Sequence, residues 1–316
     1  MNGVLYLPSV TICIVTYNSQ KCINECLDAV FNQGWPRIDV VVVDNASTDA
    51  TLSLMSQYEK IRIIENKINV GFAEGQNQAI NSVESDYYLV LNPDVILSPN
   101  YISQLVNFLE DHSEYGSATG CLLLASRPQI IDSTGLEMNW LRRAKDRGAG
   151  KNRKDFLKDT DIFGVSGAAA MYARRMIEHI SIDEEFFDAL FFAYKEDVDV
   201  AWRAQRFGWK SRYVQSAIAT HERNWGSFSS RSHIPIFVRV HSYHNRYRML
   251  INNENFTVGW ILKLPIQLMY ELLFHAYLLW KDPKVFTSLA VLPKIIKEQK
   301  NKRKKIKEKA RWSEDA

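Results

Sequence analysis

Acidic side chains follow two apolar runs in the first hundred residues of the chain. Asp44 comes directly after residues 40–43, and Asp94 follows residues 87–91 after a short Asn-Pro step. Apolar runs of this length are typical of buried strands in a parallel sheet, and open α/β sheets bind ligands beyond the carboxyl ends of such strands. A carboxylate there could hold Mg²⁺ or Mn²⁺, which in turn binds a diphosphate. The Asn-Pro-Asp triplet is also typical of a plain turn, because all three residues favour turns.

The pattern of the first 111 residues alternates strand and helix. Predicted strands cover residues 10–18, 40–43, 61–65 and 87–91, and the first of them is followed by a helical stretch at 19–32. This alternation predicts an α/β fold with a doubly wound, mostly parallel sheet flanked by helices. A chain of 316 residues is long enough for one large domain with an appendage.

Polar residues gather where these predicted strands end. Because parallel strands end at one edge of a sheet, we expect Thr16, Tyr17, Asp44 and Asp94 along a common edge. Together they outline a nucleotide pocket. Asp44 has a simpler interpretation as the cap of the helix that follows it.

Three acids lie within four positions in the second half of the chain. Glu196, Asp197 and Asp199 stand at the predicted start of an amphipathic helix, where the helix dipole favours anions. A well-capped helix therefore explains them, but their aromatic flanks indicate a semi-enclosed cleft. Asp199 most simply pairs with Arg203, four residues later.

Four short motifs, taken in order, resemble the amino-terminal half of the family-2 inverting glycosyltransferases with a GT-A fold. They are Val-Thr-Tyr-Asn at 15–18, Val-Asp-Asn-Ala-Ser-Thr-Asp at 43–49, Asn-Val-Gly-Phe at 69–72 and Leu-Asn-Pro-Asp at 91–94. The resemblance runs from about residue 10 to about residue 253. The Asn-Pro-Asp triplet and the Asn-x-Gly-Phe turn are most similar to the bacterial rhamnosyltransferase branch.

The resemblance implies a nucleotide-sugar pocket. The residues that match its motifs are Thr16, Tyr17, Asn18, Asp44, Asn69, Gly71, Asn77, Asn92 and Asp94. Among them, Thr16 and Tyr17 would line the base pocket, and Asp94 would coordinate the metal. The family's fuller form of the last motif is Asp-x-Asp, so the amide of Asn92 leaves one negative charge missing.

The resemblance also implies the catalytic groups. Asp197 would be the general base that deprotonates the acceptor hydroxyl on the face opposite the leaving diphosphate, and Glu196 would orient the acceptor. His221 would reach the same metal, although a lone histidine is more often structural. Arg223 and Arg231 are candidates for diphosphate contacts.

The stretch of small residues at 164–170 has two interpretations. It would let a strand pass close to the donor sugar, or it simply allows a strand to pack closely on a helix.

Composition and cysteine usage fit an ordinary globular enzyme. Hydrophobic residues make up 46% of the chain and charged residues 24%, and the net charge is +3. The four cysteines, at positions 13, 22, 26 and 121, have no paired metal spacing, which favours reduced cytosolic thiols. Residues 1–9 have neither a basic region nor a long apolar core, so we expect no secretory signal.

The last sixty residues differ from the rest. We expect a glycosyltransferase domain at 1–255, with a nucleotide-binding half at 1–115 and an acceptor half at 116–255, followed by a helical tail at 256–316. Charged and helix-breaking residues interrupt the apolar stretch 258–280 too often for a bilayer span, which favours an interfacial helix.

The Lys- and Arg-rich stretch 294–311 would be drawn to an anionic membrane surface. The alternative is a solvated helix pair that packs on the domain or on a second subunit of a homodimer. No nucleic-acid recognition motif accompanies the basic stretch, so we expect no nucleic-acid partner.

These observations predict an inverting, metal-assisted glycosyltransferase, cytoplasmic and peripheral on the inner face of the bacterial plasma membrane. It would move L-rhamnose from dTDP-L-rhamnose to a lipid-linked glycan acceptor in cell-surface polysaccharide assembly. One alternative is another donor, such as a different dTDP-sugar, UDP-galactofuranose or a UDP-hexose. Another is a nucleotide-binding scaffold without turnover, which would have no need of a base such as Asp197.

Overall fold

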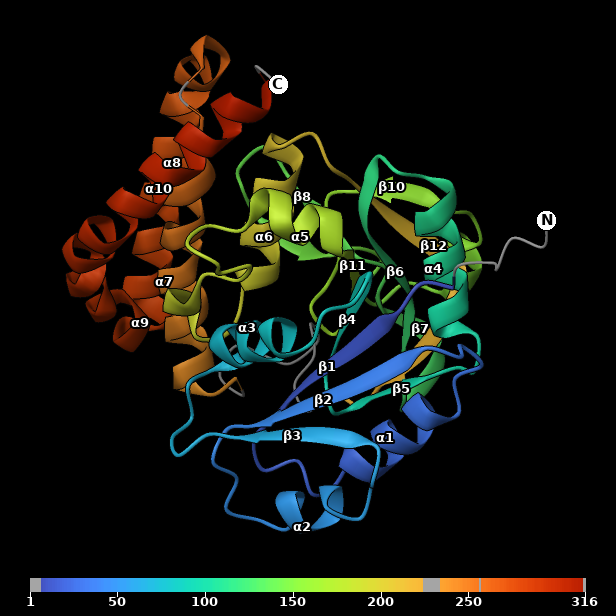
Figure 1. Ribbon diagram of the computed structural model, residues 1–316. Coiled ribbons are helices and arrows are strands. Elements are labelled where there is room, and N and C mark those ends of the chain that lie inside the picture. Colours follow the sequence, from blue (N-terminus) through green and yellow to red (C-terminus); the bar gives the residue numbers. More distant parts are fainter. Residues whose placement is uncertain (1–6, 224–233, 256, 315–316) are drawn as a thin grey trace.

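The computed structural model describes residues 7–223, 234–255 and 257–314, and for residues 311–314 it describes the backbone alone. Within this part of the chain, a ten-stranded sheet forms the centre of the molecule, with strand order β10-β12-β6-β11-β4-β1-β2-β3, while β5 pairs with β12 and β7 with β6 (Figure 1). The strands are β1 Val10–Thr16, β2 Ile38–Asp44, β3 Ile61–Glu65, β4 Tyr87–Leu91, β5 Val95–Leu97, β6 Tyr115–Leu124, β7 Arg127–Ser133, β10 Thr160–Ile162, β11 Ala169–Ala173 and β12 Lys210–His221. A separate hairpin pairs β8 Leu136–Met138 with β9 Ala144–Asp146.

Helices cover both faces of this sheet. They are α1 Ile23–Phe31, α2 Thr51–Met55, α3 Phe72–Ser82, α4 Tyr101–Asp111, α5 Arg174–Ile180, α6 Glu196–Arg206, α7 Ile236–Asn253, α8 Val258–Lys281, α9 Pro283–Thr287 and α10 Leu292–Glu314, with short 3₁₀ turns η1 Arg153–Phe156, η2 Ala189–Phe191 and η4 Ser288–Val291. In β1, Ile12 and Ile14 pack with α1 and α4, while Cys13 and Val15 pack with α3, α5 and α6. Two covered faces explain why β1 and β4 are apolar without alternation.

The first four long strands are parallel and in register. Val15 of β1 lies beside Val43 of β2, and Ile14 lies beside Leu91 of β4. The carboxyl ends of β1, β2 and β4 therefore meet at one edge, as the sequence predicts. The antiparallel strand β11 joins β4 to β6, and β5, β7 and β10 also run against their partners, so the sheet is mixed with most of its strands in one direction.

Helix α1 begins at Ile23, four residues later than the sequence predicts. Residues 17–22 instead form a loop in which Asn18 adopts a positive φ of 53°. Its backbone is tied to the loop after β2: the Ser19 N–H donates to Thr51 Oγ1 at 2.8 Å and the Gln20 N–H to Asp49 Oδ2 at 3.2 Å. These tertiary hydrogen bonds override a local helical preference.

The carboxyl-terminal helices pack against the body of the molecule beside α7 (Figure 1). Tyr243 of α7, Leu278 of α8 and Val285 of α9 share one buried cluster, and Ile306 of α10 joins the core beneath α5 and α6. Among the described residues, no helix combines the length and the apolar character needed to cross a bilayer.

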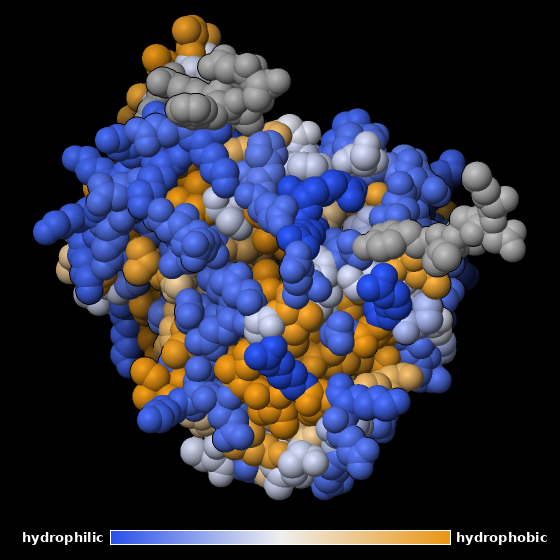
Figure 2. Space-filling view, viewed as in Figure 1, coloured by the Kyte–Doolittle hydropathy of each residue, from blue (hydrophilic) through white to orange (hydrophobic). Residues whose placement is uncertain are grey.

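Several basic side chains of α10 are already bound to the body. Lys302, Lys305 and Lys309 reach acceptors between residues 178 and 188, and Arg303 donates to the main-chain oxygens of Ile251 and Glu254. Figure 2 shows hydrophilic side chains over α10 and apolar atoms at the upper end of α8. The sequence predicts that the whole basic stretch is available to a membrane. Because several of its side chains bind the protein itself, fewer positive charges remain available than the sequence suggests.

Candidate functional site

An open cleft of about 590 Å³ lies beyond the carboxyl end of β4. Its walls come from the turn after β4, residues 166–168, the hairpin β8–β9, the start of α6 and one side of α7. Six of the predicted site residues line it together: Asn92, Asp94, Glu196, Asp197, His221 and Arg223. Thr16 and Asp44 lie beside the cleft at the ends of the neighbouring strands.

Asp44 is held from two sides. The Thr16 hydroxyl donates to Oδ1 at 3.0 Å, the Ser47 N–H donates to Oδ2 at 2.8 Å, and the side chain is only 1% exposed. Asp44 thus stabilises the turn that follows β2, whereas Ala50 is the residue at the N-cap of α2. Tyr17, next to Thr16, is 52% exposed and leaves its ring accessible for stacking on a base.

Three other residues of the predicted pocket shape the loops around it. Asn18 Oδ1 accepts from the Thr48 N–H at 2.8 Å, and Asn69 Oδ1 accepts from the Gly71 N–H at 2.9 Å. Gly71 has a φ of 90°, and a Cβ there would lie 2.6 Å from Phe192. Only glycine allows this close approach at a positive φ.

Asn77 differs from the prediction. Its amide nitrogen donates to the Phe187 carbonyl at 2.8 Å, and its oxygen accepts from the Phe187 N–H at 2.9 Å. The side chain is buried, and both of its polar ends are used within the protein. Asn77 therefore anchors the segment around residue 187, and its place in the nucleotide pocket stays a prediction.

The Asn-Pro-Asp triplet is both a turn and part of the site. The Val95 N–H donates to the Asn92 carbonyl across the triplet at 3.2 Å, which turns the chain from β4 into β5. β5 pairs with β12, and this pairing places Val95 opposite His221. Asp94 Oδ1 consequently lies 3.2 Å from His221 Nε2.

The Asp94–His221 pair fits a divalent cation. Asp132 Oδ2 lies 2.7 Å from His221 Nδ1, so the proton on that nitrogen is fixed and Nε2 is directed toward Asp94. Burial lowers the pKa of His221, but hydrogen bonds to Asp132 and Asp94 outweigh burial and raise it to about 9. With this raised pKa the ring is protonated at neutral pH, so a cation would have to displace the Nε2 proton. One carboxylate and one neutral imidazole would then be suitable ligands, and a diphosphate and water would complete the set. Among the described residues no cluster of three such side chains is present.

Asp132 and Asp146 are site residues that the sequence analysis missed. Arg223 Nε lies 3.2 Å from Asp132 Oδ1, and Arg223 Nη2 lies 3.2 Å from Asp146 Oδ2. Arg223 lines the cleft as predicted, but its charge is shared with these two carboxylates. The only sequence signal for Asp132 is its place after two isoleucines, at the end of an apolar pair. Arg231 lies outside the described residues.

Glu196 and Asp197 stand side by side at the start of α6. Asp197 Oδ2 accepts from the Gly167 N–H at 3.2 Å, whereas no described residue offers a hydrogen bond to Glu196 Oε2. Burial raises the pKa of both carboxyl groups, that of Glu196 to about 8 with a contribution from Asp197. The hydrogen-bonded Asp197 is the better site for the single negative charge, and Glu196 is the better site for a proton.

The small residues at 164–170 divide between the two interpretations of that stretch. A Cβ on Gly164 would lie 2.1 Å from the Cβ of Ala201, so this glycine allows close packing on α6. A Cβ on Gly167 would meet nothing nearer than 3.7 Å, at Asp197 and Phe72. Gly167 therefore leaves space open in the cleft beside Asp197.

The loop before α6 is strained and held by one side chain. Phe192, Tyr194 and Lys195 all have positive φ values, between 60° and 74°, which non-glycine residues rarely adopt. The buried Asn245 of α7 donates to the carbonyls of residues 191, 193 and 194 at 2.7–2.9 Å. This contact between distant segments sets the position of Glu196 and Asp197.

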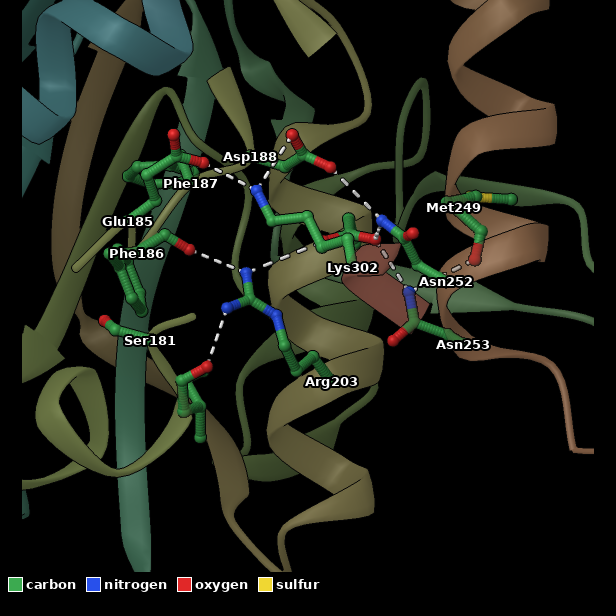
Figure 3. A network of polar contacts seen from close by, with 12 residues as sticks. Ser181, Glu185, Phe186, Phe187, Asp188, Arg203, Met249, Asn252, Asn253 and Lys302 are labelled. Carbon is green, nitrogen blue, oxygen red and sulfur yellow. Dashed lines mark hydrogen bonds and ion pairs between the residues drawn. The ribbon is translucent and has the colours of Figure 1, made fainter. Parts of the chain in front are cut away.

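A buried polar network fixes the other side of α6 (Figure 3). Asp199 lies 3.5 Å from Arg203, as the sequence predicts, and also accepts from Asn252 and Asn253 at 3.1 and 2.7 Å. Lys302 of α10 lies 3.0 Å from Asp188, whose other oxygen accepts from Asn252 at 3.3 Å. Helices α6, α7 and α10 are thus joined beside Glu196 and Asp197.

The raised pKa of Glu196 predicts a specific pH dependence of stability. A carboxyl group whose pKa is higher in the folded protein contributes most below its ordinary pKa of 4.5, and that contribution is lost as the pH rises through about 8. Glu196→Gln removes this titration. We expect the free energy of unfolding of the variant to gain on that of the wild type between about pH 5 and pH 8, by at most about 1.4 kcal/mol per pH unit, and the melting temperature to follow in the same direction. Thermal unfolding at one-unit steps measures the difference, and a constant difference across the range would contradict the protonated state of Glu196.

Comparison with known proteins gives a family and a fold. A family model described as glycosyl transferase family 2 matches residues 11–181, more than half of the chain. An uncharacterized glycosyltransferase of Haemophilus influenzae is 32% identical over 111 residues, which cover 33% of this chain and 34% of that protein. The putative teichuronic acid biosynthesis glycosyltransferase TuaG of Bacillus subtilis is 28% identical over 129 residues, 40% of this chain and 51% of its own. The alignments thus span about half or less of these relatives.

Solved structures extend the likeness beyond the matched half. GalNAc-T7, crystallised with UDP, GalNAc and Mn²⁺, has a TM-score of 0.62 at 13% identity, covering 78% of this chain and 49% of that one. The mannosyltransferase PcManGT from Pyrobaculum calidifontis, in complex with GDP-Man and Mn²⁺, has a TM-score of 0.55 at 17% identity, covering 97% and 87%. At these identities the likeness concerns the fold, and it confirms the predicted GT-A architecture.

Proposed function

The chain belongs to glycosyl transferase family 2, and on this premise we propose that it transfers a sugar from a nucleoside diphosphate to a glycan acceptor with inversion. The observation that carries the proposal is that Asp94 and Asp197 line one cleft, together with residues 166–168. The Ala168 carbonyl accepts from the Asn92 N–H at 2.9 Å, next to Asp94, and the Gly167 N–H donates to Asp197. Inversion requires a base and a leaving group on opposite faces of the sugar carbon, and we assign Asp197 to the base and Asp94 to the side of the leaving group.

The donor is proposed to lie along the edge formed by β1, β2 and β4. Thr16 and Asp44 would bind the nucleoside, with the accessible Tyr17 ring against the base. Asp94 and His221 would hold Mg²⁺ or Mn²⁺, and the solved neighbours with Mn²⁺ support a divalent ion. A bound cation supplies positive charge that offsets the charge of the leaving diphosphate.

The acceptor is proposed to approach from the side of α6 and α7. Asp197 takes the proton of the acceptor hydroxyl, whose oxygen bonds to the sugar carbon as the bond to the diphosphate oxygen breaks. Protonated Glu196 can donate a hydrogen bond to the acceptor and so orient it, since it brings no second negative charge. The sugar would lie in the cleft beside Gly167, which has no side chain to occupy that place.

L-Rhamnose from dTDP-L-rhamnose is the proposed donor, on the strength of the Asn-Pro-Asp triplet and the Asn-x-Gly-Phe turn. These motifs lie near the nucleotide, so they report the sugar only by association. We expect dTDP-rhamnose to bind more tightly than UDP-glucose by calorimetry, and to be turned over fastest in a panel of nucleotide sugars. The reverse ranking would favour a UDP-hexose, and failure to turn over any donor would favour a scaffold without catalysis.

Peripheral attachment to the inner face of a bacterial plasma membrane is a further part of the proposal. Helix α8 exposes large apolar side chains, including Leu262, Leu272, Leu273 and Trp280, while α10 adds the positive charge that its contacts leave available. Co-sedimentation with anionic vesicles at low and raised salt tests attachment. A stable homodimer that ignores such vesicles would instead assign these helices to a subunit interface.

A further inference from the structure

Four charged side chains that the transfer chemistry does not use gather where α6, α7 and α10 meet (Figure 3). Asp188, Asp199 and Arg203 are buried, and Lys302 of α10 reaches them with a side chain that is 13% exposed. The residues that line the catalytic cleft do not include any of the four. Burying charges costs free energy, so their presence needs an explanation other than contact with the substrate.

The four groups form two ion pairs that one amide joins. Lys302 Nζ lies 3.0 Å from Asp188 Oδ1. Arg203 Nη2 lies 3.5 Å from Asp199 Oδ2. The Asn252 amide nitrogen donates to both carboxylates, at 3.3 Å to Asp188 and at 3.1 Å to Asp199. The two carboxylates therefore lie close together, and removal of either cation would leave a buried negative charge uncompensated.

Arg203 cannot replace Lys302. Its guanidinium group donates to the carbonyls of Ile180 and Phe186 at 2.7 and 2.6 Å, which fixes its position beside Asp199. Among the ion pairs of the described residues, Lys302 is the only cation paired with Asp188. The buried charge of Asp188 thus depends on a residue of α10.

Asp188 begins the loop that leads into the catalytic pair. We call residues 188–195 the α6 entry loop, because Glu196 and Asp197 follow it directly. Asp188 Oδ1, the oxygen that lies beside Lys302, accepts from the Leu190 N–H at 3.1 Å and caps η2. The second half of the loop is held by α7, through the three carbonyls that accept from Asn245. Since the loop contains residues with positive φ, it keeps its conformation only while both halves are held.

We propose that Lys302 is a positioning residue for the transfer reaction. Its ammonium group holds the ionised Asp188 at the start of the α6 entry loop, and the loop in turn fixes Glu196 and Asp197 in the cleft. The proposal rests on the proposed glycosyl transfer and adds α10 to the parts of the chain on which that reaction depends. The competing explanation is that Lys302 contributes only to overall stability.

The test compares two methionine variants of the full-length protein, at a temperature at which thermal unfolding shows both to be folded. Lys302→Met removes the cation and keeps most of the apolar stem. Lys305→Met is the matched control on the same helix, because its ion pair with Asp183 is exposed and contributes little. We expect Lys302→Met to lower kcat by about tenfold or more, since displacement of catalytic groups by about 1 Å costs up to ~10²-fold, and Lys305→Met to leave kcat unchanged. Binding of the nucleoside diphosphate, measured by calorimetry, should stay near the wild-type value in both variants, because the ends of β1, β2 and β4 lie outside the loop.

A second substitution tests whether Lys302 acts through Asp188. Asp188→Asn removes the buried charge that Lys302 compensates, and asparagine can still accept from the Leu190 N–H as a cap. In the Asp188→Asn background, Lys302→Met should therefore change kcat by less than about twofold. This comparison remains possible if Lys302→Met alone fails to fold. A tenfold further loss in that background would overturn the proposal.

Hydrogen exchange, followed by mass spectrometry, measures the order of the α6 entry loop without a need for turnover. We expect the amides of residues 189–196 to exchange faster in Lys302→Met than in Lys305→Met, while those of β1 and β4 stay as protected as in the wild type. Faster exchange over the whole chain would instead indicate a loss of overall stability and would overturn the positioning role. Equal exchange of the loop in the two variants would overturn it as well.

The two readouts separate this proposal from the proposed function. If the wild type transfers sugar and Lys302→Met has the wild-type kcat, the positioning role fails and the transferase assignment stands. If the wild type transfers sugar from no donor, the transferase assignment fails, and the positioning role for transfer fails with it. Hydrogen exchange then still shows whether Lys302 holds the loop.

Discussion

Asp197→Asn is expected to lower kcat for sugar transfer by about 10²–10⁴-fold, the usual effect of removing one positioned base. The asparagine keeps the size of the side chain and can still accept from the Gly167 N–H, but it cannot take the acceptor proton. Binding of the nucleoside diphosphate, measured by calorimetry, should stay close to that of the wild type.

Asp39→Asn is the matched control for this experiment. Asp39 is exposed at the amino end of β2, at the edge of the sheet opposite Asp44. The kcat of Asp39→Asn should therefore equal that of the wild type. Near-normal turnover by Asp197→Asn would instead indicate that Glu196 is the general base. The pH profile supplies a second check, because burial raises the pKa of Asp197 and activity should fall as acid protonates it.

Chelation is expected to stop turnover, because Asp94 and His221 are the two protein groups that converge where the diphosphate is proposed to bind. Asp132→Asn tests the same site without touching a ligand. Asp132 fixes the orientation of His221 at 2.7 Å, and loss of such a partner costs about 10–100-fold in metal affinity. The binding of Mn²⁺ with nucleoside diphosphate, followed by electron paramagnetic resonance, measures this without a need for activity.

Unchanged turnover after thorough chelation would contradict the metal site. Stabilisation of the leaving group would then fall to Arg223, which already lies in the cleft between Asp132 and Asp146. Arg223→Gln should in that case reduce kcat far more than Asp132→Asn does.

The sheet edge could be predicted because each of its residues follows a long apolar run. Asp44 and Asp94 lie at the ends of strands buried on both faces, and a buried parallel strand leaves its next polar residue at the ligand-binding edge. The resemblance to the family also indicated Asp197 and His221. For these residues, the position predicted from the local sequence agrees with the position that the fold gives them.

The supporting residues could not be predicted, because their roles depend on contacts between distant segments. Asp132 supports His221 across 89 residues, and Asn245 holds a strained loop about fifty residues earlier. Lys302 resembles any solvent-exposed lysine of a basic helix in the sequence, yet it pairs with Glu185 and Asp188 more than a hundred residues away. A prediction from the charge pattern alone therefore assigned some side chains to a membrane, although these side chains bind the protein itself.

The anomeric configuration of the first product tests the central claim most directly. Proton NMR during hydrolysis or transfer, at times short relative to mutarotation, reads the configuration at the sugar carbon while the donor is consumed. The account predicts inversion, because one base, Asp197, directs a single displacement opposite the diphosphate. A product that keeps the configuration of the donor would contradict it.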